Sequence, residues 1–537
     1  MTATESIELD SRGIRFAPSS EDKTDEQARL QDDLTLRRLG KRPLLTRSFG
    51  FMSILGLSCS ALSSWEGTLG TTPPTLLIAG PAGVLWAFVV SWIGTMSVTA
   101  TMAELASAAP TAGGQYQPEL TSKSDYWVAM IAPESCAAFL TYLTAWLTTL
   151  AWQAAALTSN YTTATILQGI IVLTNPSYVA RQWHTILIIY AVTFFTVAIN
   201  FTTSRTLAKI EGLILILHLA GFFGILVPLV YFAPHNTASF VFETIRNDHG
   251  WPSQGVAFLV GLPTVASALI GADCAVHMSE EIQSASTVVP KALIYTLLLN
   301  GTLAFALLIG FLFSISDLEA ATKASATMFY PFLHVFKTAV KSTAGAAAMA
   351  SIIFVLAVAS TIGSYAAASR MLWSFARDRG VPLSQHLLNK NALPTNAIIA
   401  TTGTTVILSL IVLASSVALG ALLSLVIAAL FSSYLLSCSL LLWRRCTNTR
   451  GRGISRDEVR MQWGPWRIPE PFGTINNIIA CMYAALLLFW SFWPQSPNPS
   501  PEGFNWSILV FGTTLLFSVA WYWVRAHRHF RGPVKEV

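Results

Sequence analysis

The sequence predicts an all-α, polytopic membrane protein, and three observations support that fold class. Of its 537 residues, 53% are hydrophobic and only 11% are charged, whereas soluble domains contain about 25% charged residues. Apolar runs of about 20 residues, the length that crosses a bilayer core, recur between positions 49 and 525. Polar linkers, which divide soluble chains of this size into domains, do not separate these runs.

The two ends of the chain differ from the part between them. Residues 1–47 mix both charge signs, contain few large apolar residues and lack the apolar core of a signal peptide, so we expect a mostly disordered cytoplasmic tail. Residues 48–525 form the predicted membrane domain, and residues 526–537 form a short cytoplasmic C-terminal tail. The six cysteines have no CxxC pair and lie mostly in apolar runs, which predicts neither a disulfide framework nor a zinc site.

The apolar runs predict twelve membrane spans. The third run is too long for one perpendicular helix, so we expect a tilted helix with an extension outside the membrane. In chain order, the spans lie near residues 49–70, 79–105, 133–172, 183–202, 206–232, 255–278, 291–314, 345–373, 396–415, 418–442, 474–493 and 506–525.

Lys and Arg in the short loops indicate the orientation of the spans. The segment before span one and the loops after spans eight and ten are basic, whereas "GTTPPT", "ASSVALG" and "WPQSPNPSPEGFNW" contain neither Lys nor Arg. Basic loops face the cytoplasm, which puts both termini there, as an even number of spans requires. The segment between spans seven and eight runs against this trend with Lys323, Lys337 and Lys341.

Two spans contain small residues that would allow a helix to unwind. Span one reads "FMSILGLSCSALSSWEG", with Gly56, Ser58 and Ser60, and span six reads "GLPTVASALIGADCAVHMSEE", with Ser267 and Gly271. Transporters often bind substrate where two such helices unwind near the bilayer midplane, although small residues also allow close helix packing. Asp273 follows Gly271 directly, and a carboxylate inside a bilayer is costly unless it is paired or functional. It therefore favours a binding site.

Three motifs resemble a known family. They are "MAELASAAPTAGGQY" (102–116), "GADCAVHMSEEIQSASTVVPKA" (271–292) and "GSYAAASRMLWSFARDRGVP" (363–382). Together they resemble the fungal amino acid/choline transporter group, which includes GABA and choline permeases, of the amino acid–polyamine–organocation (APC) superfamily. The resemblance covers roughly residues 45–525. It implies a LeuT-like fold of five-plus-five inverted repeats with two further helices, which works by alternating access.

The resemblance implies a substrate pocket at the two broken spans. Gly271 and Asp273 would line it, with the Asp273 carboxylate neutralising the ammonium of the substrate; capping of the second half of span six, or pairing with a basic residue, is the alternative. Gly56, Leu57 and Ser58 match the Gly-x-Gly break of relatives, whose backbone N–H groups hold a substrate carboxylate. Ser58 replaces the second glycine, which puts carriage of a standard α-amino acid in doubt. Ser60 and Ser267 complete the predicted polar contacts.

His218 in span five is the candidate for proton coupling. Relatives that run on protons have a lysine at the matching position, between spans one, five and eight, and a histidine titrates near neutrality. Ser360 and Thr361 in span eight are the hydroxyls that could face His218. The alternative is a neutral histidine bonded to a helix carbonyl.

Four charged residues lie at predicted cytoplasmic helix ends and are candidates for an ion-pair gate. For Glu280 and Glu281 we favour solvated helix-end charges, whereas Glu104 and Arg370 lie in the family motifs and are expected to form a structural or gating pair. Among the aromatic residues, Trp152 and Tyr365 could stack on a quaternary ammonium. Lipid-facing or interface positions are the commoner use of tryptophan, and the chain has 17 of them.

The sequence contains no Walker loop, catalytic triad spacing or HExxH motif, so we expect neither an enzyme nor a resident cofactor or metal. The predicted partners are a small-molecule substrate, protons and the lipid bilayer, without nucleic acid. The main hypothesis is a proton-coupled plasma-membrane transporter for an amino acid or a small amine such as GABA. A choline or other quaternary-ammonium transporter is the second, mildly supported by Ser58, and a nutrient sensor without transport is the third. The sequence leaves the exact substrate and the oligomeric state open.

Overall fold

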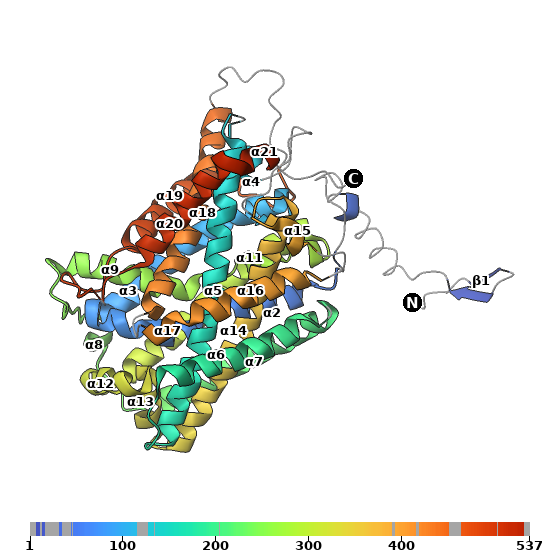
Figure 1. Ribbon diagram of the computed structural model, residues 1–537. Coiled ribbons are helices and arrows are strands. Elements are labelled where there is room, and N and C mark those ends of the chain that lie inside the picture. Colours follow the sequence, from blue (N-terminus) through green and yellow to red (C-terminus); the bar gives the residue numbers. More distant parts are fainter. Residues whose placement is uncertain are drawn as a thin grey trace.

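The computed structural model describes residues 7–10, 13–16, 32–34, 45, 47–114, 127–133, 135–202, 204–388, 393–414, 418–449, 463–501 and 503–530. Most of the predicted N-terminal tail and residues 531–537 lie outside this set, so the disorder expected there stays a prediction. Within the tail, β1 (Ile7–Asp10) and β2 (Gly13–Phe16) pair as an antiparallel hairpin. The other regular elements of the described chain are helices, mostly α, with the 3-10 helices η2 and η3 and the π-helix η4 (Figure 1).

The helices are long and closely packed. In the first half they are α2 (Phe51–Leu62), α3 (Ser64–Ala108), α4 (Trp127–Ile131), α5 (Ala137–Thr174), α6 (Gln182–Asn200), α7 (Ser204–Phe232) and α8 (Ala238–Phe242). The region of predicted span six contains α9 (Gln254–Ala266), η2 (Ser267–Leu269), α10 (Cys274–His277) and η3 (Ser279–Glu281). Next come α11 (Ala285–Phe313), α12 (Leu318–Met328), α13 (Pro331–Val340), α14 (Thr343–Arg377), α15 (Ser384–Leu387), α16 (Thr395–Ser409) and α17 (Ile411–Ala414). The chain continues with α18 (Ala418–Thr449), α19 (Phe472–Trp490), α20 (Ser507–Trp521), η4 (Tyr522–Ala526) and α21 (His527–His529).

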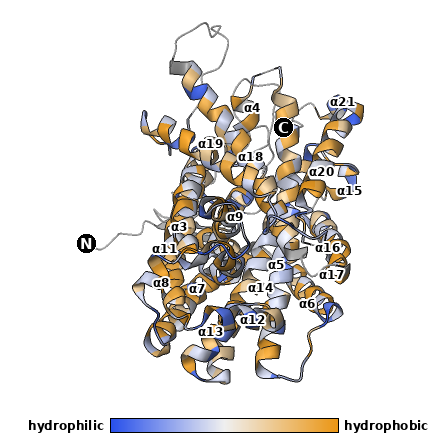
Figure 2. Cartoon of the chain, turned by 90° about the vertical axis from the view of Figure 1, so that its left-hand side faces the viewer, coloured by the Kyte–Doolittle hydropathy of each residue, from blue (hydrophilic) through white to orange (hydrophobic). Residues whose placement is uncertain are grey.

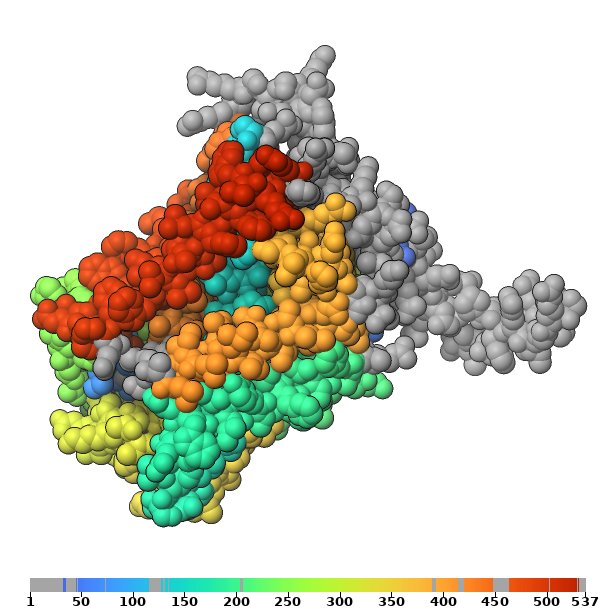
Figure 3. Space-filling model, in the orientation of Figure 1, coloured from blue at the N-terminus to red at the C-terminus, as the bar shows by residue number. Residues whose placement is uncertain are grey.

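Two sets of helices make up the buried centre. One consists of α3 packed along α9 and α11, and the other of α5 packed along α14 and α18. α5 has 38 residues without a break, about 57 Å at the α-helical rise. The third run is therefore one long helix, and its tilt and its extension outside the membrane stay predictions. Figure 3 shows α5 between α20 and α16 on one face of the molecule.

Apolar side chains cover the outer helices, as a lipid environment requires. Phe194 of α6, Tyr231 of α7, Met482 of α19 and Trp523 beyond α20 are each about two-thirds exposed or more, and Figure 2 shows apolar residues along the outer faces of these helices. The described residues include nine helices long and apolar enough to cross a membrane: Pro74–Ala108, Gln182–Asn200, Thr206–Phe232, Ala285–Phe313, Thr343–Arg377, Thr395–Leu413, Gly420–Thr447, Phe472–Trp490 and Ser507–Ala526. These features indicate an integral, multi-pass membrane protein.

Three of the twelve predicted spans are outside that set of nine, for identifiable reasons. Spans one and six are each divided into shorter helices. Span three corresponds to α5, whose many threonines lower its mean hydropathy. Twelve crossings therefore stay a prediction.

Gly80 makes the turn between predicted spans one and two inside α3. Its φ of 76° and ψ of 177° interrupt the helix, and a Cβ there would lie 2.6 Å from the backbone nitrogen of Arg246. Only glycine avoids both the backbone strain and the close contact. α3 is therefore two helices joined at a corner, residues 64–79 and 81–108.

Candidate substrate cavity

The break in span one lies at Ser63. This residue is in the left-handed region (φ 45°, ψ 47°) between α2 and α3. Gly56, Leu57 and Ser58 are instead helical and buried within α2, so the predicted break there is wrong. A Cβ on Gly56 would collide with the backbone oxygen of Glu211, which means that Gly56 allows α2 and α7 to pack closely.

The break in span six lies at Gly271, where the sequence predicts it. The chain leaves η2, passes through Gly271 with a φ of 129°, and becomes helical again at Cys274. A Cβ on Gly271 would lie 3.1 Å from the Ala61 carbonyl oxygen and 3.3 Å from the Leu62 Cα. The two breaks are therefore in contact.

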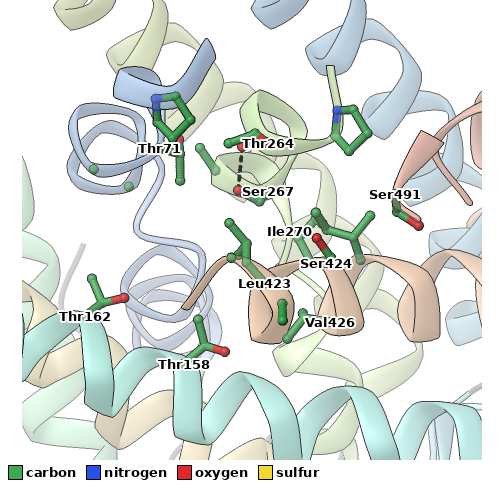
Figure 4. A pocket seen from close by; sticks show the side chains of 18 of the residues that line it. Thr71, Thr158, Thr162, Thr264, Ser267, Ile270, Leu423, Ser424, Val426 and Ser491 are labelled. Carbon is green, nitrogen blue, oxygen red and sulfur yellow. Dashed lines mark hydrogen bonds between the residues drawn. The ribbon is translucent and has the colours of Figure 1, made fainter. Parts of the chain in front are cut away.

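A cavity of about 850 Å³ reaches both breaks. Its walls come from the first part of α3 and from α5, α9 and α18, and side chains of these helices point into it (Figure 4). The walls are rich in hydroxyl groups, and Ser267 donates a hydrogen bond of 2.6 Å to the Thr264 carbonyl oxygen. His249 and residues between Trp490 and Trp506 line its outer part; we call this side the open end.

The opposite end is held by buried ion pairs, and we call it the ion-pair end. Arg370 of α14 donates to Glu281 at 2.9 Å, and Arg377 of α14 donates to Glu280 at 2.7 Å. Both glutamates are at most 3% exposed, so the prediction of solvated charges is wrong. The physical reason is that the chain beyond the Gly271 break lies buried against α14. The Arg377 guanidinium also lies 4.5 Å from the centre of the Trp373 ring.

Glu104 does not pair with Arg370. It accepts two hydrogen bonds from Arg445 of α18, at 2.7 and 2.6 Å, and one from the Ile468 backbone N–H. Arg445 also binds Glu470 and lies over the Trp463 ring. Since Arg370 is taken by Glu281, the predicted Glu104–Arg370 pair is wrong, although both residues do form buried pairs.

Four predicted site residues line the cavity and others do not. Trp152, Ser267, Gly271 and Ser360 are among the lining residues. The predicted substrate-binding residues absent from the described lining are Gly56, Leu57, Ser58, Ser60, Asp273 and Tyr365.

Asp273 lies outside the cavity wall, on the side of Gly271 that leads to the ion-pair end. It is 3% exposed and borders a separate small cavity with Tyr434, which lies within hydrogen-bonding reach. Its Oδ2 is 3.9 Å from Nε2 of His277. The His277 ring in turn lies edge-on to Trp152, with ring centres 5.5 Å apart. In this conformation Asp273 therefore does not reach the cavity.

Ser60 and Tyr365 are part of the helix packing. Ser60 donates to Glu211 of α7 at 2.9 Å, and Tyr365 is fully buried, with Thr193 and Thr405 as its neighbours. Glu211 is a buried intramembrane carboxyl group that the sequence interpretation missed. Its position in a long apolar run was the available signal.

Glu66 is an acidic residue of the cavity lining that the sequence interpretation missed. It lies in the first turn of α3, three residues after the Ser63 break, and lines the cavity. Its Oε1 is 2.8 Å from Nδ1 of His218, and both side chains are at most 3% exposed. A carboxylate in a predicted span was the available signal, the same one that singled out Asp273.

His218 therefore faces Glu66 rather than the hydroxyls of span eight. Ser360 donates instead to the Ala61 carbonyl oxygen at 3.4 Å. Thr361 lies 3.1 Å from the Thr163 hydroxyl and donates to the Ala357 carbonyl oxygen. The expected contacts of His218 with Ser360 and Thr361 are wrong, because Glu66 occupies the Nδ1 side of the ring.

Within the described residues, no group of three or more His, Cys, Asp or Glu side chains is arranged to hold a metal ion. All six cysteines are free. Among the described residues, the cavity lining thus combines apolar side chains with hydroxyl groups, aromatic rings and the Glu66 carboxylate.

Membrane-length helices around a cavity that reaches two helix breaks define a polytopic membrane transporter. The chain belongs to the amino acid permease family, whose model matches residues 49–514. The family indicates a transporter rather than an enzyme, and a small-molecule substrate moved across a membrane.

The similar proteins are fungal, in agreement with the resemblance seen in the sequence motifs. A choline transporter of Saccharomyces cerevisiae is 28% identical over 90% of this chain and 83% of its own length. An uncharacterized amino-acid permease of Schizosaccharomyces pombe is 25% identical over 97% and 89%, respectively. A putative amino acid/polyamine transporter of Macrophomina phaseolina is 25% identical over 84% and 96%.

Proposed function

We propose that this chain is a proton-coupled transporter for an amino acid or a related small amine such as GABA, and that it works by alternating access. The observation that carries the proposal is a cavity that reaches two contacting helix breaks, open at one end and closed at the other by buried ion pairs. A transporter of this type needs one closed end at a time. Twelve spans in a LeuT-like five-plus-five arrangement with two further helices are part of the proposal.

The orientation follows from the basic loops. The ion-pair end contains Arg370 and Arg377, close to the basic loop after span eight, whereas the segment at the open end contains neither Lys nor Arg. By the positive-inside rule the ion-pair end is cytoplasmic. Both termini then face the cytoplasm, and the cavity faces outward, as expected for an uptake system in the plasma membrane.

The buried Glu66–His218 pair supports proton coupling. A histidine is the side chain whose unperturbed pKa lies nearest to neutrality, and this one contacts a carboxylate of the cavity wall at 2.8 Å. A proton bound at the pair would therefore be sensed directly at the cavity.

Choline is the second candidate substrate. Among the described lining residues there is no Lys or Arg, so a substrate carboxylate would have to rely on backbone N–H groups such as those at the start of α3. A quaternary ammonium ion without a carboxylate needs no such partner. The Saccharomyces cerevisiae relative, named a choline transporter, favours the same candidate.

Uptake into liposomes tests the proposal. The purified chain is reconstituted, an inward proton gradient is imposed, and entry of labelled GABA, other amino acids, polyamines and choline is compared with protein-free vesicles. We expect uptake of at least one amine that falls when the gradient is collapsed with an ionophore. Binding without net uptake would indicate the nutrient sensor instead, and uptake that ignores the gradient would contradict proton coupling.

A further inference from the structure

We propose that Glu66 is the carboxylate that binds the positively charged amine of the substrate, and that His218 is a positioning residue that holds it. This inference rests on the proposed function, because it assigns the amine-binding group within the same cavity. The sequence favours Asp273 of span six for the amine-binding role. We assign this role instead to Glu66 of span one.

Position is the first argument. Among the described residues that line the cavity, Glu66 is the acidic one. Asp273 borders a different, smaller cavity beneath Gly271 and already has His277 and Tyr434 as neighbours. A substrate that enters from the open end thus meets Glu66 first.

The hydrogen bonds of the two carboxylate oxygens are the second argument. Oε1 of Glu66 is bound to His218, whereas Oε2 is buried and has no hydrogen-bond partner among the described residues. A buried carboxylate oxygen without a partner is costly. An ammonium group or the methyl groups of a quaternary ammonium ion would remove that cost by electrostatic attraction.

The surroundings of His218 explain how one oxygen is kept for the substrate. The imidazole is fully buried, and its ring centre lies 5.6 Å from that of Trp65. Trp65 also packs against Phe222. These contacts fix the ring so that Nδ1 meets Oε1. Because Oε1 is engaged by Nδ1, Oε2 is the carboxylate oxygen left for the substrate.

The charge and aromatic content of the cavity is the third argument. No Lys or Arg belongs to the described lining, so no fixed cation competes for Glu66. Trp152 lines the same cavity, and an indole face attracts ammonium groups. The chemistry selects a small cation or zwitterion, and disfavours an anion.

The experiment compares the two acids directly. Glu66→Gln, Asp273→Asn and, as a matched control, Glu319→Gln on the exposed first turn of α12 are reconstituted, and the KM for labelled GABA and labelled choline is measured. Excess butyrate, which lacks the amine of GABA, and the neutral carbon isostere of choline serve as competitors. Size-exclusion profiles in detergent check folding.

We expect Glu66→Gln to raise the KM on the order of 100-fold, the loss that follows from removing one partner of a buried charge pair. It should also abolish the preference for the amine over the analogue that lacks the positive charge. Asp273→Asn and Glu319→Gln should keep that preference. If Glu66→Gln does not fold, Glu66→Asp, which retains the charge, should raise the KM less while keeping the preference. His218→Leu should raise the KM about tenfold and, because the proposed function places proton binding at the Glu66–His218 pair, should also weaken the dependence of uptake on the proton gradient. His218→Asn, which restores a donor, should recover part of the KM.

If Glu66→Gln changes neither the KM nor the preference for the amine, and Asp273→Asn raises the KM and abolishes that preference, the inference is overturned in favour of Asp273. Loss of the amine preference in Glu66→Asp would also overturn it. Absence of amine uptake by the unmodified chain would reject the proposed function and this inference together. This outcome is distinguishable from failure of the inference alone, because it is measured on the unmodified chain.

Discussion

The two helix breaks are each followed by an acidic residue beside a histidine, but the surroundings of the two acids differ. Each is followed within three residues by an acid, Glu66 after Ser63 and Asp273 after Gly271, and each acid lies beside a histidine. Glu66 is 2.8 Å from His218 and lines the cavity, whereas Asp273 is 3.9 Å from His277 and lies beneath it. The chain direction explains the difference. Span one runs toward the open end and span six toward the ion-pair end.

The segments that follow the two breaks are held in place by different contacts. The chain beyond Gly271 is tied to α14 by two buried ion pairs. It also forms a parallel bridge between Ile282 and Phe49, at the start of α2. The described chain just beyond Ser63, residues 64–79, is held at the cavity wall by the buried Glu66–His218 pair. If the chain works by alternating access as proposed, opening the ion-pair end requires the Arg370–Glu281 and Arg377–Glu280 pairs to separate, whereas substrate binding at the open end does not.

The largest expected effect comes from Arg370→Ala, which leaves Glu281 buried without its guanidinium. Removing one partner of a buried pair costs about 3–5 kcal/mol, so thermal unfolding in detergent should occur at a clearly lower temperature. The double variant Arg370→Ala/Glu281→Ala removes both charges and should recover part of that loss. Equal midpoints for the single and double variants would mean that the pair does not hold the segment beyond Gly271.

Much of the fold could be predicted because hydropathy is a local property. The nine membrane-length helices fall on predicted spans, and the Gly271 break was marked by a glycine and an acid inside one apolar run. Ser63 had no such mark, since serine rarely adopts a left-handed conformation. Gly56 looked like a break because glycine serves helix packing as well as unwinding.

The partners of the charged residues could not be predicted from the sequence. Glu66 and His218 are 152 positions apart, and Glu104 and Arg445 are 341 apart. Which arginine reaches which glutamate depends on how α14 and α18 pack, and no local pattern encodes that. The sequence predicts a structural or gating pair between Glu104 and Arg370, whereas each forms a buried pair with another residue, Arg445 and Glu281 respectively.

A smaller but still large effect is expected from Gly271→Ala. A side chain at a φ of 129° is strained, and its Cβ would lie 3.1 Å from the Ala61 carbonyl oxygen. Backbone strain and overpacking together should destabilise the protein by about 2–4 kcal/mol and separate the two breaks. Uptake and the unfolding midpoint should fall together, with Gly512→Ala in α20, where a Cβ meets no atom within 4 Å, as the control. A normal midpoint in Gly271→Ala would mean that the contact between the breaks is not needed for stability.

The smallest effect is expected from Ser63→Gly, which tests whether the span-one break has the same steric constraint. Glycine relieves the cost of about 1 kcal/mol that a non-glycine residue incurs at a φ of 45°. It also loses the hydrogen bond of 2.7 Å from the Ser63 hydroxyl to the Ser60 carbonyl oxygen, worth about 1 kcal/mol. Because these terms nearly cancel, the unfolding midpoint should move by no more than a few degrees, as for a change of about 0.5 kcal/mol. A loss as large as that of Gly271→Ala would show that both breaks are under the same steric constraint.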